Sequence, residues 1–116
     1  MQPESLKYIY DVQISIQSIN DFILSINSFQ DFENNKLIKR AVERELEIIG
    51  EAINRLLKID PAIQISNARK IVNLRNWVIH SYDNVDSVII WVILQKDLPL
   101  LQKEVAKLLN WSFLIH

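Results

Sequence analysis

A chain of 116 residues, 49% of them hydrophobic and 23% charged, has the size of one domain and enough apolar side chains for a single core. Its 13 basic and 14 acidic side chains give a net charge of -1, which excludes a global positive field, so any contact with nucleic acid must be local. The absence of cysteine excludes disulfides, Cys-ligated zinc and thiol nucleophiles, and the single glycine favours helices over a many-stranded sheet.

We expect no targeting segment at the beginning of the chain. Residues 1–5 have neither a basic leader nor a following apolar stretch, which are the two features of a signal peptide. The longest apolar run, residues 88–94, is far shorter than the roughly 20 residues that a helix needs to cross a bilayer. We therefore expect a cytoplasmic protein that does not enter a membrane, with residues 1–116 in one helical domain.

Apolar residues at helical spacing predict two long helices in the first half of the chain. We expect the first at 4–29 and the second at 35–58, with polar residues 31–36 interrupting the pattern. Gly50 is interpreted as a site of close helix packing, because glycine otherwise costs a helix about 1 kcal/mol. Pro61 ends the second helix, since the residue before a proline avoids the helical conformation. The expected core positions are Ile9, Val12, Ile16, Ile19, Ile23 and Ile26, followed by Leu37, Ala41, Ile48, Ile49, Ala52, Ile53 and Leu56.

Two further helices are predicted in the second half. The third covers 67–82, with Ser66 or Asn67 as the capping residue. The fourth covers 86–110, and Pro99 in its interior predicts a kink near Asp97, because proline lacks the amide hydrogen and its ring clashes with the preceding turn. The apolar residues 111–116 are left unassigned. Four helices with short connections indicate a helix bundle.

The chemically active side chains gather on the third helix. At 100° per residue, its core face is formed by Ile71, Leu74, Trp77 and Val78. Asn76 and His80 are four residues apart and therefore neighbours on a different arc, and Arg75 and Tyr82 align almost two turns apart. Val72 and Ile79 lie between Arg75 and Asn76 in angle. A polar cluster among apolar side chains favours a dimer interface that contains a polar cleft, and we expect the face of Val72 and Ile79 to form the dimer contact.

These residues resemble a known family. The pattern Arg-Asn-x-x-x-His-x-Tyr at 75–82, the stretch 43–52 (ERELEIIGEA) upstream and the stretch 97–101 (DLPLL) downstream are together similar to the HepT toxins of the HEPN superfamily. The likeness extends over residues 36–109. Asn73 and Ser81 depart from it, because a glycine is common at those places in the family.

The resemblance implies a fold and an activity. The fold is an all-α, HEPN-like up-and-down bundle of four or five helices that dimerises, so that two motifs meet in one cleft. The activity is that of a metal-independent endoribonuclease toxin that acts on RNA and uses no cofactor. The resemblance also implies a partner, a minimal nucleotidyltransferase antitoxin that adenylylates Tyr82.

The residue types suit metal-independent RNA cleavage. Histidine titrates near neutrality, so the two copies of His80 in a dimer could act as general base and general acid. Arg75 could hold the phosphate with its bidentate fork and stabilise the negative charge that builds on it. Asn76 would orient His80 or the phosphate. The catalytic assignment is therefore Arg75, Asn76 and His80, with Tyr82 as the adenylylation site and no metal site.

Each of these residues also has a structural interpretation. Taken alone, Arg75 and Asn76 are typical of a solvated helix face, His80 of a structural histidine near a helix end, and Tyr82 of a packing residue. The competing functional class is a noncatalytic HEPN module in which the same motif holds a nucleotide or docks a partner.

The charged residues of the second helix allow three interpretations. Glu43, Glu47 and Glu51 have a four-residue spacing, but neither histidine follows a glutamate by three positions, as a helical di-metal site requires. We therefore predict a solvated stripe that pairs with the neighbouring cations Lys39, Arg40, Arg44 and Arg55. Alternatively, Lys36, Lys39, Arg40 and Arg44 form a local phosphate-binding strip.

Overall fold

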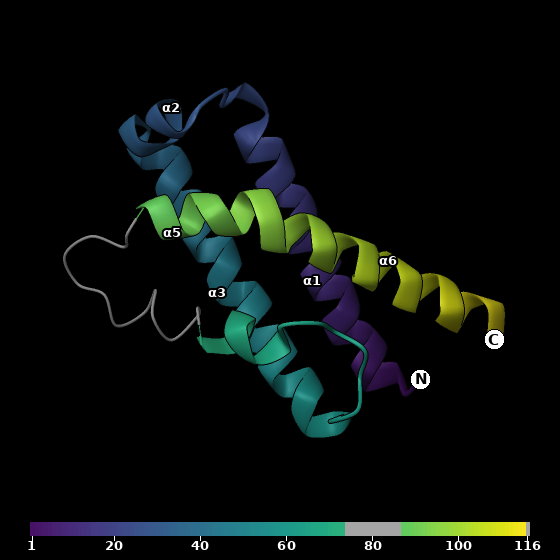
Figure 1. Ribbon diagram of the computed structural model, residues 1–116. Coiled ribbons are helices and arrows are strands. Elements are labelled where there is room, and N and C mark those ends of the chain that lie inside the picture. The colour runs from purple at the N-terminus through teal and green to yellow at the C-terminus, as the bar shows by residue number, and fades with distance from the viewer. Residues whose placement is uncertain (74–86, 116) are drawn as a thin grey trace.

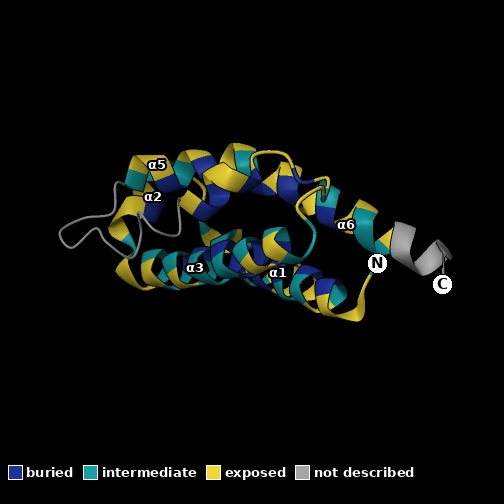
Figure 2. Cartoon of the chain, turned by 90° about the horizontal axis from the view of Figure 1, so that it is seen from below, coloured by how far each residue is buried: buried dark blue, intermediate teal, exposed yellow. Residues whose placement is uncertain are grey.

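The computed structural model describes residues 1–73 and 87–115, and for residues 111–115 it describes the backbone alone. Within these ranges the chain is helical with short connections, and it contains no strand. α1 (Pro3–Phe22) and α3 (Lys36–Ile59) run antiparallel in one layer, and α5 (Ser87–Val92), η2 (Ile93–Asp97) and α6 (Leu98–Ile115) cross them in a second layer (Figures 1 and 2). The predicted all-α bundle is therefore confirmed.

The first predicted helix ends earlier than the sequence indicates. α1 stops at Phe22, a single 3₁₀ turn η1 (Ile23–Ser25) follows, and a short helix α2 (Phe29–Asn34) occupies part of the segment that we expected to be irregular. Ser28 begins α2, because its Oγ accepts a hydrogen bond from the Asp31 backbone N–H at 3.2 Å. Phe32 on α2 is fully buried, so this corner of the chain contributes to the core.

α3 agrees with the second predicted helix. Asn35 caps it, accepting a hydrogen bond from the Ile38 backbone N–H on its Oδ1 at 3.0 Å. Gly50 is buried, as close packing of this helix requires. Leu37 is wrongly predicted as a core residue, because its side chain is 80% exposed. At 100° per residue it points almost opposite to the buried Leu46, so the apolar side chain in the first turn faces away from the bundle.

The second half agrees with the start of the third predicted helix and with the fourth, and the rest of the third, residues 74–82, lies outside the described residues. Residues 68–73 are helical, and the backbone carbonyl of Asn67 accepts a hydrogen bond from the Ile71 N–H at 3.0 Å. Near Asp97, where we expected a kink, the chain forms a π-helical turn that covers Ile93–Asp97 and ends two residues before Pro99. A wider turn at this place accommodates a residue that cannot donate a backbone hydrogen bond. α6 then continues to Ile115, so most of the unassigned tail is helical.

The core lies between the two layers. The predicted positions Ile9, Val12, Ile16 and Ile19 on α1 are at most 2% exposed, and Ile71 on the helix at 68–73 is 7% exposed. Val72 is only 6% exposed, which corrects the expectation that it forms the dimer contact, because it packs inside its own subunit. None of the described helices has both the length and the apolar character needed to span a membrane.

Candidate active site

The predicted catalytic residues Arg75, Asn76 and His80 lie outside the described residues, as do Tyr82 and Ile79. The structure instead describes the frame that holds both ends of the segment 74–86. One end is the helix at 68–73, and the other is the first turn of α5, which begins at Ser87. The contacts of these two described ends fix the residues that precede and follow the segment.

The helix that leads into the segment is fixed to the second layer by packing and by one ion pair. Its inward-facing residues Ala68, Ile71 and Val72 belong to the core. On its outer side, Lys70 Nζ lies 3.2 Å and 3.3 Å from the two carboxylate oxygens of Asp97. The Asp97 side chain is only 12% exposed, whereas that of Lys70 is 60% exposed. The pair therefore connects this helix to the π-helical turn that closes with Asp97.

α5, which follows the segment, is held by a polar and an aromatic contact. Ser87 Oγ accepts a hydrogen bond from Lys39 Nζ at 3.5 Å, which connects the start of α5 to α3. One turn later, the ring of Trp91 lies 5.6 Å from the ring centroid of Phe32 and 6.3 Å from that of Phe29. Tilted aromatic pairs at these distances are favourable contacts. α5 is thus anchored on α3 five residues after the predicted motif and on α2 nine residues after it.

The glutamates of α3 form ion pairs with basic residues on the same helix. Arg44 Nη1 lies 3.2 Å from Glu47 Oε2, and Arg55 Nε lies 2.9 Å from Glu51 Oε1. Arg55 also bonds the Tyr8 hydroxyl, and this bond and the one to Glu51 raise the pKa of its guanidinium. Within the described ranges, no group of His, Cys, Asp and Glu could hold a metal ion. The predicted ion-pair stripe is therefore confirmed for Glu47 and Glu51.

Glu43 differs from the other glutamates of this helix. Burial raises the pKa of its carboxyl group, and the positive charges of Arg40 and Lys39 offset only part of that increase. Glu43 lies one turn after Lys39, whose ammonium contacts Ser87. This carboxyl group is thus a partly desolvated acid on the part of α3 from which Lys39 reaches α5.

The alternative phosphate-binding strip on α3 is less suitable than its sequence indicates. Of its four basic residues, Arg44 is paired with Glu47, and Lys39 donates to Ser87. Glu43, Glu45 and Glu47 follow on the same helix and reduce its positive potential. Lys36 and Arg40 remain exposed.

Sequence reasoning did not identify the contacts that frame the segment. Lys70 and Asp97 are 27 residues apart, and Lys39 and Ser87 are 48 residues apart. Helical periodicity reports only on neighbours within one helix, so it contains no signal for either pair. The family resemblance was the available signal that α3 and the region of Asp97 belong with the motif. Its upstream stretch at 43–52 lies on α3, and its downstream stretch begins at Asp97.

The described residues form a two-layer, all-α bundle, which is consistent with the HEPN-type class of helical proteins. A family model described as "Ribonuclease HepT-like" matches residues 12–108. The chain therefore belongs to the HepT-like ribonuclease family, and the resemblance drawn from the sequence is confirmed.

Curated relatives agree with this membership. "Putative RNase MJ1380" of Methanocaldococcus jannaschii is 38% identical over 100 residues, which cover 84% of this chain and 90% of that protein. "Probable ribonuclease HepT" of Thermococcus cleftensis is 34% identical over 105 residues, which cover 87% of this chain and 92% of that protein. No solved structure matches the chain.

Proposed function

We propose that this protein is a metal-independent endoribonuclease whose catalytic groups are Arg75, Asn76 and His80. The observation that carries the proposal is the family match over residues 12–108, which includes the whole of the motif at 75–82. The relatives are named as RNases, and an RNA-cleaving enzyme is the function that the family supports. The anchored ends of the segment support the same proposal, because a catalytic segment needs fixed ends to hold its geometry.

The proposed reaction is an attack of the RNA 2′-oxygen on the neighbouring phosphorus. The bond from the 2′-oxygen to phosphorus forms, and the bond from phosphorus to the leaving 5′-oxygen breaks. One His80 removes the proton from the 2′-hydroxyl, and the His80 of a second copy donates a proton to the 5′-oxygen. Arg75 stabilises the negative charge that builds on the phosphate, and Asn76 orients the phosphate or His80. The products are a 2′,3′-cyclic phosphate and a free 5′-hydroxyl.

The proposed active form is a homodimer, because each chain provides one His80 for a reaction that uses two proton-transfer groups. The contact is not built on Val72, which is buried in its own subunit. Exposed apolar side chains adjoin the motif on its other side, where Val88 is 53%, Ile89 is 42% and Val92 is 40% exposed on α5. A second copy that covers this face of α5 would bring the two motifs toward one cleft.

The proposed regulation is adenylylation of Tyr82 by a nucleotidyltransferase antitoxin. The phenol oxygen of Tyr82 would attack the α-phosphorus of ATP, form a new bond from oxygen to phosphorus and release pyrophosphate. The attached nucleotide would bring a phosphate charge close to Arg75 and compete with RNA for it. This would make the protein the toxin of a toxin-antitoxin pair.

The test of catalysis is purified protein incubated with RNA in excess EDTA, compared with His80→Ala. We expect wild-type protein to cut and to leave 2′,3′-cyclic phosphate ends, and we expect the variant to lose about 10² to 10⁴-fold in rate with unchanged helicity. Cleavage by the variant at the wild-type rate would reject His80 as a catalytic residue. Cleavage that stops in EDTA would reject the metal-independent reaction.

The same experiment separates this proposal from the noncatalytic alternative. A nucleotide-binding or partner-docking module would bind its ligand through the motif and cut no RNA under any condition. For regulation, ATP, magnesium and the nucleotidyltransferase should add the mass of one or more adenylyl groups on Tyr82. Tyr82→Phe should still cut RNA and escape neutralisation. Modification at another residue would reject the assignment of Tyr82.

A further inference from the structure

The charges of this chain are divided unevenly between its two halves. Residues 1–60, which form α1, α2 and α3, contain seven basic and ten acidic side chains. Residues 61–116 contain six basic and four acidic side chains. The net charge of -1 therefore conceals an acidic layer of α1 and α3 and a more basic layer that includes α6.

Three lysines of the basic layer share one exposed face. Lys96 in the π-helical turn η2 and Lys103 and Lys107 on α6 are all exposed. Lys103 and Lys107 are four residues apart, and Lys96 precedes Lys103 by seven, so the three fall within about 50° of each other around the helix axis. None of the three forms an ion pair within the described ranges. We call these residues the lysine strip.

The acidic groups nearest in sequence to the lysine strip are bonded to residues outside it. Asp97 is paired with Lys70 and is largely buried. Glu104 accepts a hydrogen bond from the Ser66 backbone N–H on its Oε2 at 2.8 Å, and its Oε1 is buried. The two acids therefore fasten the connection at 66–70 to the second layer, and their charges do not cover the exposed ammonium groups of the strip.

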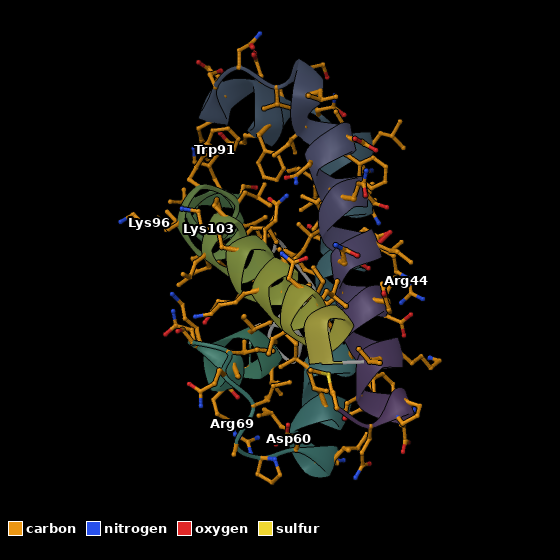
Figure 3. All side chains as sticks on the ribbon, turned by 90° about the vertical axis from the view of Figure 1, so that its right-hand side faces the viewer. Arg44, Asp60, Arg69, Trp91, Lys96 and Lys103 are labelled. Carbon is orange, nitrogen blue, oxygen red and sulfur yellow. The ribbon has the colours of Figure 1, made fainter. Side chains whose placement is uncertain are left out.

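The lysine strip begins beside the entry to the predicted motif. Lys96 precedes Asp97, which holds Lys70, and Lys70 precedes Arg75 by five residues. Arg69 adds a further exposed cation from the same helix. Figure 3 shows Lys96, Lys103 and Arg69 on one side of the molecule and Arg44 of α3 on the opposite side. The basic surface is thus on the side of α6 and separate from the ion-paired residues of α3.

We infer that the lysine strip binds the phosphate backbone of single-stranded RNA and guides a substrate strand along α6 from the motif. This inference rests on the proposed ribonuclease function and names the surface on which its substrate lies. Ammonium groups on flexible stems contact phosphate as point charges without reading bases. The strip therefore contributes affinity and no sequence preference. A local group of positive charges also explains how a chain with a net negative charge can bind a polyanion such as RNA.

The test is the binding of a fluorescent 2′-O-methyl RNA strand by the full chain, measured by anisotropy at several salt concentrations. This RNA has no 2′-hydroxyl to attack the phosphate, so its binding can be measured whether or not the protein is a ribonuclease. The variant is Lys103→Gln/Lys107→Gln. The matched control is Lys36→Gln/Lys58→Gln, which removes the same charge from two exposed lysines of α3 that form no ion pair within the described ranges.

We expect the strip variant to bind RNA more weakly than wild type. A plot of log affinity against log salt concentration should also be less steep by about 1.4, because each lysine that contacts a phosphate of a single strand contributes about 0.7 to the slope and two lysines are replaced. Between 50 and 200 mM salt, the affinity of the variant should then fall about sevenfold less than that of wild type. The control should keep the wild-type slope.

An unchanged slope in the strip variant, or an equal change in the control, would overturn the inference. So would a strip variant that binds RNA normally and loses only its contact with a protein partner. If the wild-type protein shows the expected salt dependence of binding but cuts no RNA, the proposed catalysis is refuted and the lysine strip is not.

Discussion

Phe32 provides the sharpest test of how the bundle holds the motif. It is fully buried on α2, a helix that the sequence did not reveal, and its ring contacts Trp91 on α5 at 5.6 Å. Phe32→Ala removes most of a ring, leaves a cavity and breaks the aromatic pair. Substitutions of this kind cost about 3 to 5 kcal/mol. This is a large fraction of the roughly 5 to 15 kcal/mol by which a domain is stable.

The measurement is urea unfolding monitored by circular dichroism, with Phe22→Ala as the matched control. Phe22 ends α1 and is 36% exposed, so the same substitution should cost clearly less there. We expect the free energy of unfolding of Phe32→Ala to fall by about 3 to 5 kcal/mol. As urea is added, RNA cleavage by this variant should fall at lower concentrations than those that unfold the whole domain, because Phe32 holds α5, the helix that follows the motif in the chain. Equal losses of stability in the two variants would refute the role of Phe32 as the anchor of this corner.

Three further outcomes are expected. Arg75→Lys keeps the charge and loses the planar fork, so cleavage should fall at least about tenfold, and full activity would mean that a positive charge alone suffices. Val88→Asp places a charge on the proposed dimer face and should yield monomers of low activity in light scattering, while Leu24→Asp at a 78% exposed position should leave the dimer intact. Burial raises the pKa of Glu43, so the folded state disfavours its charged form. Glu43→Gln should therefore stabilise the protein in urea unfolding at pH 7. The gain in stability of the variant over wild type should disappear as the pH falls to about 4, near the ordinary pKa of glutamate, because the wild-type carboxyl group is then protonated. A variant that is less stable than wild type at pH 7 would contradict the desolvation argument.

The sequence by itself determined the long helices and the family. The spacing of Ile9, Val12, Ile16 and Ile19 repeats every three or four residues, and a pattern of that length leaves one helical face to be buried. Asn35 and Pro61 similarly mark the ends of α3. The motif at 75–82 was identified from residue types at fixed spacing, and the family match then covered it. The roles of its residues remain predictions, since they lie outside the described part of the chain.

Tertiary structure decided which apolar surfaces belong to the core. Leu37 and Val72 are both apolar residues on helices, yet one is 80% exposed and the other 6% exposed. Periodicity gives the angle of a side chain around its own helix and does not say whether its own chain or a second copy covers that angle. Periodicity likewise did not predict the corner at 23–34, where Ser28 caps a new helix and Phe32 on that helix is buried in the core. The same limit applies to the contact between Lys70 and Asp97, because only packing of the helices brings together residues so distant in the chain.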